Sequence, residues 1–330
     1  MPNTIALFGA TGNVGRELIN SLKNTGGDFD YLVFTRSTTA IDTTSDAPFQ
    51  SVSLPTKEER TDQKALADIL KSKEVETCFL CIPQLLVASA KKFVEENFLT
   101  AFKLAGIKRV VKIGTGNAEQ YEYGKRHIEA EDAIRSADFK LTVLQGGDFS
   151  TNPHWLGPAP PGAPYILIDV FKGMSYLYYV GVGMFRSMGN LASFFGTDIN
   201  QPFLHLADFG DAIASCLIHA PEHEKKTYKI YSDKVSMNDV AKVYGDLLGR
   251  KIHILKMSDD EIKDLMALDG TKGELADVVV EMCARFREGV YEPDDTWDGF
   301  QQLCPGKTTR KFEDFAKNKV DAGFKPLKLW

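Results

Sequence analysis

The opening segment of the chain constrains its fold more than any other feature. Residues 4–8 are an apolar run typical of a buried β-strand, and they lead directly into the glycine-rich residues 9–15, after which apolar residues recur at helical spacing. Gly9 would permit a tight turn, Gly12 a close approach of a pyrophosphate, and Gly15 close packing of the helix on the sheet. This strand, turn and helix predict a dinucleotide-binding site.

The second predicted strand indicates which dinucleotide would bind. Tyr31–Phe34 ends where the adenosine ribose would lie, and a free 2′-hydroxyl is usually met there by Asp or Glu. This chain instead has Arg36, whose guanidinium suits a 2′-phosphate, so the sequence favours NADP(H). The expected cofactor contacts are Gly9, Thr11, Gly12, Asn13, Val14, Gly15, Arg36, Pro83, Thr115 and Lys125.

Strands alternate with helices along the first half of the chain, which predicts an α/β fold with a Rossmann-type, doubly wound parallel sheet. We expect residues 1–152 to form the NAD(P)-binding domain. Residues 153–330 would form a smaller α/β substrate-binding region, from which residues 203–232 return to the sheet. Further strands are predicted at residues 49–54, 75–82, 109–113, 141–144, 203–206, 227–231 and 252–255. Helices are predicted at residues 62–72, 88–105, 123–136, 208–219 with Asp208 as N-cap, 236–248, 259–266 and 275–287.

Composition excludes several classes of protein. The chain has 330 residues, 43% of them hydrophobic, a net charge of −6 and scattered lysines, so we expect no nucleic-acid partner. The first strand leaves no room for a leader, and no apolar run is long enough to span a membrane, so we expect a cytoplasmic protein. Cys78 and Cys81 would point to opposite faces of a strand, which favours free thiols and no metal.

Several motifs in a fixed order resemble the NmrA-like family, an atypical branch of the short-chain dehydrogenase/reductases. They are Gly9–Gly15, Arg36, Ala105–Val111, His127–Glu131, Leu141–Leu144, Asp148–Asn152, Ala207–Ala214 and Phe312–Ala316. The resemblance, to quinone oxidoreductase-type and isoflavone reductase-like members, implies an NADPH-dependent reductase or a non-catalytic, dinucleotide-binding redox sensor. The chain departs from the family pattern at Gln145-Gly146, where Arg-Pro is usual, and at Gly114, where Ser is usual.

Two registers for the catalytic residues stay open. Tyr121 and Lys125 have the Y-x-x-x-K spacing in which, in the larger superfamily, the Tyr donates a proton and the Lys lowers its pKa. Thr115 would then precede Tyr121 by only six residues, which is short for the usual Ser, Tyr and Lys. In the other register His127 takes the family position that often carries Lys, and it would titrate near neutral pH.

The segment after residue 152 is rich in aromatic residues and methionine, which suits a flat, apolar substrate beside the cofactor. A core helix or a contact between two copies of the chain would use the same residues. The expected pocket residues are Phe149, Trp155, Tyr178 and Phe185. The sequence thus favours reduction of a small aromatic or conjugated carbonyl, quinone or imine compound. A redox sensor that regulates a partner protein is the alternative, and a dehydratase or isomerase that keeps bound cofactor ranks lower.

Overall fold

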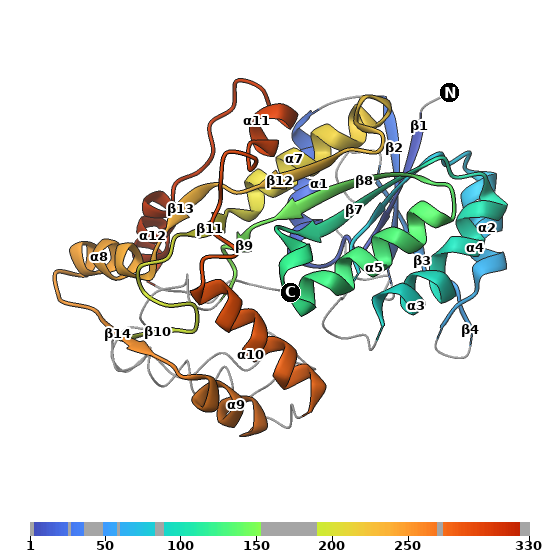
Figure 1. The fold of residues 1–330 in the computed structure, drawn as a ribbon. Coiled ribbons are helices and arrows are strands. Elements are labelled where there is room, and N and C mark those ends of the chain that lie inside the picture. Colours follow the sequence, from blue (N-terminus) through green and yellow to red (C-terminus); the bar gives the residue numbers. More distant parts are fainter. Residues whose placement is uncertain are drawn as a thin grey trace.

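The computed structural model describes residues 3–25, 28–35, 49–57, 60–82, 89–152, 190–268 and 273–323. Its centre is a seven-stranded parallel sheet in the order β3-β2-β1-β6-β7-β8-β12, which confirms the predicted doubly wound sheet (Figure 1). The strands are β1 (Asn3–Phe8), β2 (Phe29–Thr35), β3 (Phe49–Ser53), β6 (Thr77–Leu80), β7 (Arg109–Thr115), β8 (Lys140–Gly146) and β12 (Thr227–Ile230). The strand order reverses between β1 and β6, and sheets of this kind bind ligands at the carboxyl ends of the strands at such a point.

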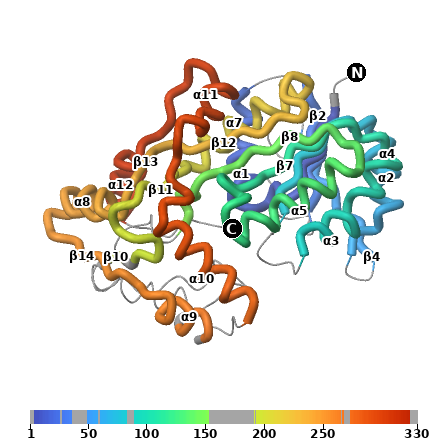
Figure 2. Tube along the Cα trace, in the orientation of Figure 1, coloured from blue at the N-terminus to red at the C-terminus, as the bar shows by residue number. Residues whose placement is uncertain are grey.

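Helices cover both faces of this sheet, so its strands are apolar on both sides. On β1, Ile5 and Leu7 pack toward one helical layer, and Ala6 and Phe8 pack toward the other. The first layer contains α1 (Asn13–Thr25) and α7 (Leu206–Ile218), which lie against each other although they are far apart in sequence (Figure 2). The second contains α2 (Gln63–Ser72), α3 (Ala90–Val94), η2 (Glu95–Leu99), α4 (Thr100–Ala105) and α5 (Glu122–Ser136).

The helix predicted over residues 88–105 is described from Ala90 and is helical to Ala105, but its middle turn, η2, is π-helical. Gly106 ends it in the left-handed conformation, as predicted, with φ +80°. The capping box predicted at Ser236 is also present, with Asp239 as the reciprocal partner.

The C-terminal half adds smaller sheets and a group of helices beside the main sheet (Figure 1). A three-stranded sheet consists of β9 (Asp148–Phe149), β11 (Gln201–Leu204) and β13 (Asp233–Val235). A two-stranded sheet pairs β10 (Asn190–Ser193) with β14 (His253–Lys256), and in the N-terminal half β4 (Thr56–Lys57) pairs with β5 (Arg60–Thr61). The remaining helices are η3 (Ala118–Gln120), η5 (Ala220–His223), α8 (Met237–Leu248), α9 (Asp259–Leu268), α10 (Glu274–Arg287), α11 (Gly299–Leu303) and α12 (Phe312–Asp321).

One prediction about the return to the main sheet is wrong. The strand expected at residues 203–206 does not join it, because β12 occupies the edge beside β8 with Thr227 opposite Val143. The strand β11 pairs instead with β9 and β13. The chain can pass closely here because residue 147 is glycine, where a Cβ atom would overlap the Pro202 carbonyl oxygen.

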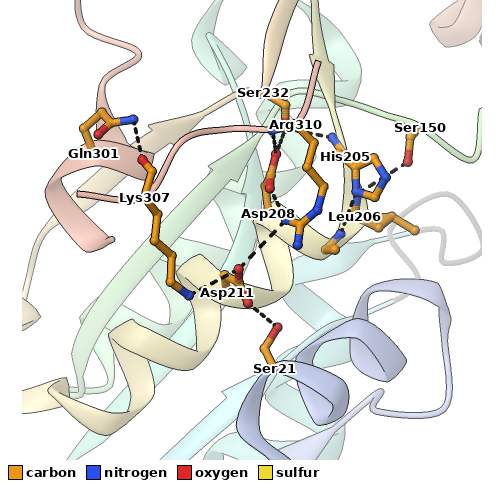
Figure 3. A network of polar contacts seen from close by, with 11 residues as sticks. Ser21, Ser150, His205, Leu206, Asp208, Asp211, Ser232, Gln301, Lys307 and Arg310 are labelled. Atoms are coloured by element: carbon orange, nitrogen blue, oxygen red, sulfur yellow. Dashed lines mark hydrogen bonds and ion pairs between the residues drawn. The ribbon is translucent and has the colours of Figure 1, made fainter. Parts of the chain in front are cut away.

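The prediction that Asp208 caps a helix is also wrong. The helix α7 begins two residues earlier, and the Nδ1 atom of its N-cap His205 accepts the Ala207 N–H at 3.2 Å. Asp208 is fully buried in the first turn because other groups hold its carboxylate (Figure 3). Ser232 Oγ donates to Oδ2 at 2.5 Å, the Arg310 backbone N–H donates to the same atom at 2.9 Å, and the Arg310 guanidinium pairs with Oδ1. This network fastens the segment before α12 to α7.

Candidate functional site

The glycine-rich turn lies at the carboxyl end of β1, beside the point where the strand order reverses. Gly9 has φ +82°, and a Cβ atom there would overlap the carbonyl oxygen of Cys81, the first residue after β6. A Cβ atom on Gly15 would overlap the backbone of Ala10. At Gly12, in contrast, a Cβ atom would meet only the Gly9 carbonyl oxygen, at an ordinary 3.5 Å. Folding therefore requires glycine at positions 9 and 15, and position 12 is exposed and open.

The N-terminus of α1 that follows this turn is available to an anion. The first turn of α1 contains no acidic residue, and Val14 is buried, so no carboxylate of this turn would repel an anion at its backbone N–H groups. The turn is braced by Arg16, whose Nε donates to the Thr11 carbonyl at 3.1 Å. This open helix start fits a pyrophosphate. Arg36 and Pro83, the other expected cofactor contacts near it, lie outside the described residues.

A closed set of hydroxyl groups lies at the carboxyl ends of β7 and β8. The Thr115 hydroxyl is 2.7 Å from the Tyr121 hydroxyl and 3.1 Å from that of Tyr291. Tyr121 also donates to the Gly116 carbonyl at 3.1 Å, and Tyr291 to the Gly146 carbonyl at 2.9 Å. All three side chains are buried, and burial raises the pKa of Tyr121 well above its ordinary value. These hydrogen bonds therefore join the three hydroxyl groups to one another and to the backbone at the ends of β7 and β8.

Lys125 does not meet Tyr121, although the spacing placed both on one helical face. Tyr121 precedes α5 as its N-cap in extended conformation, so its side chain turns toward Thr115 instead of following the helix. Lys125 is exposed and pairs with Glu122. The Y-x-x-x-K register therefore gives no proton donor with an adjacent cation.

The segment after α10 covers these strand ends, and sequence reasoning did not single it out. Besides Tyr291, it supplies Trp297, whose ring leaves no room for a side chain at residue 116, which is glycine. Asn117 Nδ2 donates to the Val290 carbonyl at 2.8 Å, and Lys229 Nζ donates to Asn117 Oδ1 at 2.7 Å. The ends of three neighbouring strands are thus tied to one C-terminal segment.

His127, on the inner face of α5, is 5% exposed, and neither ring nitrogen has a hydrogen-bond partner in the described structure. Burial lowers its pKa well below 6.5, the nearby Lys112 ammonium lowers it further, and the Ile113 carbonyl opposes this. The expectation that His127 titrates near neutral pH is therefore wrong. At pH 7 the ring is neutral and offers one N–H donor and one acceptor.

Lys112 is a buried cation that the sequence reasoning missed inside a β-strand. Its side chain is fully buried, and Nζ donates to the Ile113 carbonyl at 2.7 Å and lies 3.4 Å from Glu131 Oε1. Burial lowers the Lys112 pKa, and the Glu131 carboxylate opposes this. Arg135, at 3.5 Å, is a second cation beside Glu131. No sequence pattern links Lys112 on β7 with Glu131, which lies 19 residues later on α5, so this pair could not be predicted.

Tyr123 is the other residue that the sequence reasoning overlooked. It precedes His127 by four residues, the same spacing as Tyr121 and Lys125, and the two rings lie edge to face with centroids 5.1 Å apart. Tyr123 is partly exposed, and its hydroxyl makes no hydrogen bond among the described residues. Burial raises its pKa, with a smaller contribution from Cys81. The Y-x-x-x-H spacing in the second register was the signal that could have found it.

Of the expected pocket residues, Phe149 lies in the described structure, at the carboxyl end of β8 with its ring 5.6 Å from that of Phe209. Trp155, Tyr178 and Phe185 lie outside the described residues. Cys78 and Cys81 pack toward opposite helical layers, as predicted. Within the described ranges no cluster of His, Cys, Asp and Glu could hold a metal, and no helix there is long and apolar enough to cross a membrane.

No protein-family profile matches the sequence, and neither does the sequence of any curated protein. Solved structures do share the fold. A complex of NADPH-dependent quinone oxidoreductase with NADPH from Escherichia coli is 18% identical, with a TM-score of 0.73 over 96% of this chain and 99% of that one. Triphenylmethane reductase of Citrobacter sp. with NADP(H) is 17% identical, with a TM-score of 0.71 over 95% and 99%.

A nucleoside-diphosphate-sugar epimerase from Staphylococcus aureus is 16% identical, with a TM-score of 0.69 over 96% of this chain and 99% of that one. The Rossmann-type fold expected from the sequence is thus confirmed over nearly the whole chain. The same fold carries reductases and an epimerase, so the reaction has to be argued from the site.

Proposed function

We propose that this protein is an NADPH-dependent oxidoreductase that reduces a small aromatic or conjugated carbonyl, quinone or imine compound. The observation that carries the proposal is the open turn at Gly12, at the start of α1 and at the strand-order reversal. Similar structures with bound NADPH or NADP(H), one a quinone oxidoreductase and one a dye reductase, support the choice of cofactor and reaction class.

The residues present fit a dinucleotide. The backbone of residues 11–14 would hold the pyrophosphate, because position 12 carries no side chain and the first turn of α1 contains no acidic residue. Arg36 would select the 2′-phosphate. Bound NADPH would supply a hydride to the acceptor, which takes up one proton to complete the reduction.

The task of the chain is then to orient the acceptor and exclude water near the carboxyl ends of β6 and β7. His127 lies there as a neutral donor and acceptor. Its low pKa suits a hydrogen bond to the acceptor better than release of a proton from an imidazolium. The hydrogen-bonded hydroxyl groups of Thr115, Tyr121 and Tyr291 would form a rigid side of the acceptor site.

A dinucleotide-binding sensor is the second candidate. The absence of a Tyr–Lys proton donor in the described structure favours a sensor. The Tyr121 hydroxyl is buried and bonded to Thr115, and Lys125 is exposed and pairs with Glu122. A sensor would need the turn at Gly12 and a partner protein, but no acceptor site.

The deciding experiment is NADPH consumption by the purified protein across quinones, aryl ketones, enones and cyclic imines, with NADH as control. Gly12→Val is the matched variant, since a Cβ atom at this exposed position would meet only the Gly9 carbonyl oxygen, at 3.5 Å. We expect one compound class to be turned over by the wild type, and the variant to keep its Tm but lose NADPH binding.

Tight NADPH binding without consumption of any compound would instead support the sensor. If Gly12→Val binds NADPH as the wild type does, the proposed cofactor site is wrong. An Arg36→Ala variant that keeps its preference for NADPH over NADH would refute the role given to Arg36.

A further inference from the structure

Two polar groups on the first two turns of α5 have unused hydrogen-bonding capacity. Both ring nitrogens of His127 are buried without a partner, and the Tyr123 hydroxyl makes no hydrogen bond among the described residues. Buried polar groups in folded proteins are nearly always paired, so an unpaired buried imidazole indicates that another molecule completes its bonding. Tyr123 packs against the cluster that contains Tyr121 and Tyr291, and the hydroxyl groups of those two residues are hydrogen-bonded within the protein.

The two groups lie together and close to the strand-order reversal. Their rings are in edge-to-face contact at 5.1 Å. Cys81, which is near enough to Tyr123 to affect its pKa, directly follows β6, and its N–H donates to the Phe8 carbonyl at the end of β1. The pair lies on α5, which packs against β7, the strand next to β6 in the sheet, and this fold holds its ligand at the carboxyl ends of these strands.

We propose that the Tyr123 hydroxyl and the His127 ring N–H form a two-donor site for one oxygen atom of the substrate, a conjugated carbonyl or quinone oxygen. This inference rests on the proposed function and adds the residues that contact the acceptor. Two donors aimed at the same oxygen stabilise the negative charge that develops there as the hydride arrives at carbon. Tyr123 acts as a hydrogen-bond donor and keeps its proton, and the proton that the reduced oxygen takes up comes from solvent after hydride transfer.

The charged and titratable surroundings agree with two neutral donors. Lys112 lies on the strand side, Cys81 follows β6, and the helix itself contributes Glu131, Arg126 and Arg135. The Ile113 carbonyl accepts from Lys112 Nζ at 2.7 Å, and neither ring nitrogen of His127 has a hydrogen-bond partner among the described residues. The raised Tyr123 pKa keeps its hydroxyl protonated, and the Cys81 thiol, with a pKa of about 11, also stays neutral.

The test separates acceptor binding from turnover. Menadione is titrated into the NADP⁺ complex, which has no hydride to give, and binding is followed by quenching of protein fluorescence. The variants are Tyr123→Phe and His127→Leu, with Tyr228→Phe as the matched control, because the Tyr228 hydroxyl is bonded to His223 at 2.8 Å on the edge strand β12, which β8 and β7 separate from β6. The Kd for NADP⁺ is measured in parallel for every variant.

We expect Tyr123→Phe and His127→Leu each to weaken menadione binding roughly two- to tenfold, with NADP⁺ affinity unchanged. The kcat of Tyr123→Phe with an acceptor that is turned over should fall about 100-fold. Tyr123→Phe should fold normally since its hydroxyl has no partner among the described residues, and His127→Leu, which removes unpaired atoms, should melt at a higher temperature than the wild type.

Menadione binding that is absent from the wild-type complex, or equal in all variants, would overturn this inference even if NADPH is consumed through other residues. Tyr123-dependent binding without any NADPH consumption would uphold it and reject the reductase. Loss of NADP⁺ binding in Tyr123→Phe would also count against it, because the hydroxyl would then serve the cofactor.

Discussion

The buried ion pair between β7 and α5 gives a stability prediction with a definite sign. The side chains of Lys112 and Glu131 are 0% and 3% exposed, and their charged atoms are 3.4 Å apart. Among the described residues, Glu131→Gln leaves the ammonium without a nearby anion, and its remaining acceptor is the Ile113 carbonyl at 2.7 Å. Removal of one partner of a buried pair costs about 3–5 kcal/mol, a large part of the roughly 5–15 kcal/mol that stabilises a domain.

The reverse single variant should be milder. Lys112→Met leaves Glu131 beside Arg135, whose guanidinium is 3.5 Å away and 45% exposed, so the carboxylate keeps a cation. We expect Lys112→Met to cost less than Glu131→Gln. The double variant Lys112→Met with Glu131→Leu buries no charge and should be within a few kcal/mol of the wild type in either direction.

The pH dependence supplies a second test of the same pair. The Lys112 pKa lies below 10.5 in the folded protein, so between the folded pKa and pH 10.5 the unfolded chain holds more protons on this lysine and stability rises with pH. Because Glu131 opposes the lowering, Glu131→Gln should extend this rise to lower pH. Urea unfolding at several pH values, followed by circular dichroism, measures both effects. A Glu131→Gln cost below about 1 kcal/mol, or a double variant less stable than Glu131→Gln, would refute the reasoning.

Three further predictions concern single sites. Since the folded His127 pKa lies below 6.5, this residue should contribute a fall in stability of about 1.4 kcal/mol for each pH unit below 6.5 until its folded pKa is reached, and His127→Leu should remove that contribution in acid urea titrations but not those of His205 and His223. Gly15→Val should lower the Tm sharply and Gly12→Val hardly at all, and equal losses would contradict the distinction between them. Asp208→Asn should cost about 3 kcal/mol in denaturant unfolding, because its carboxylate holds Ser232 and Arg310 in a buried network, and a loss like that of the more exposed Asp211→Asn would argue against this (Figure 3).

Local patterns predicted the sheet well. Apolar runs bounded by glycine and proline locate strands such as β1 and β7, and glycines at 106 and 249 mark helix ends by their left-handed conformation. The errors came from long-range contacts. Nothing near Asp208 in sequence indicates that Arg310, 102 residues later, takes the carboxylate away from a capping role. The apolar pattern at residues 203–206 likewise does not distinguish this strand from those of the main sheet. Its place beside β8 is taken by β12, which follows later in the sequence.

The site was predicted in part for the same reason. The glycine-rich turn is one contiguous segment, so its geometry follows from its own residues. The choice between Tyr121 and Tyr123 instead depends on where α5 begins. A helix that started two residues earlier would put Tyr121 on the exposed face with Lys125, whereas the extended backbone at Tyr121 lets its side chain turn to Thr115, and His127 lies on the inner face beside Tyr123. Such a shift is within the ordinary uncertainty of helix boundaries.

The energetics of α5 support a functional reading of its inner face. The helix buries an unpaired imidazole and one member of an ion pair within two turns, and both reduce stability compared with apolar residues of similar size. Other contacts compensate nearby: Tyr291 and Asn117 tie the C-terminal segment to the ends of β7 and β8, which holds the start of α5 in place. If stability alone had shaped this face, leucine would serve at position 127. An increase in Tm on His127→Leu together with weaker acceptor binding would show that this cost is retained for a ligand.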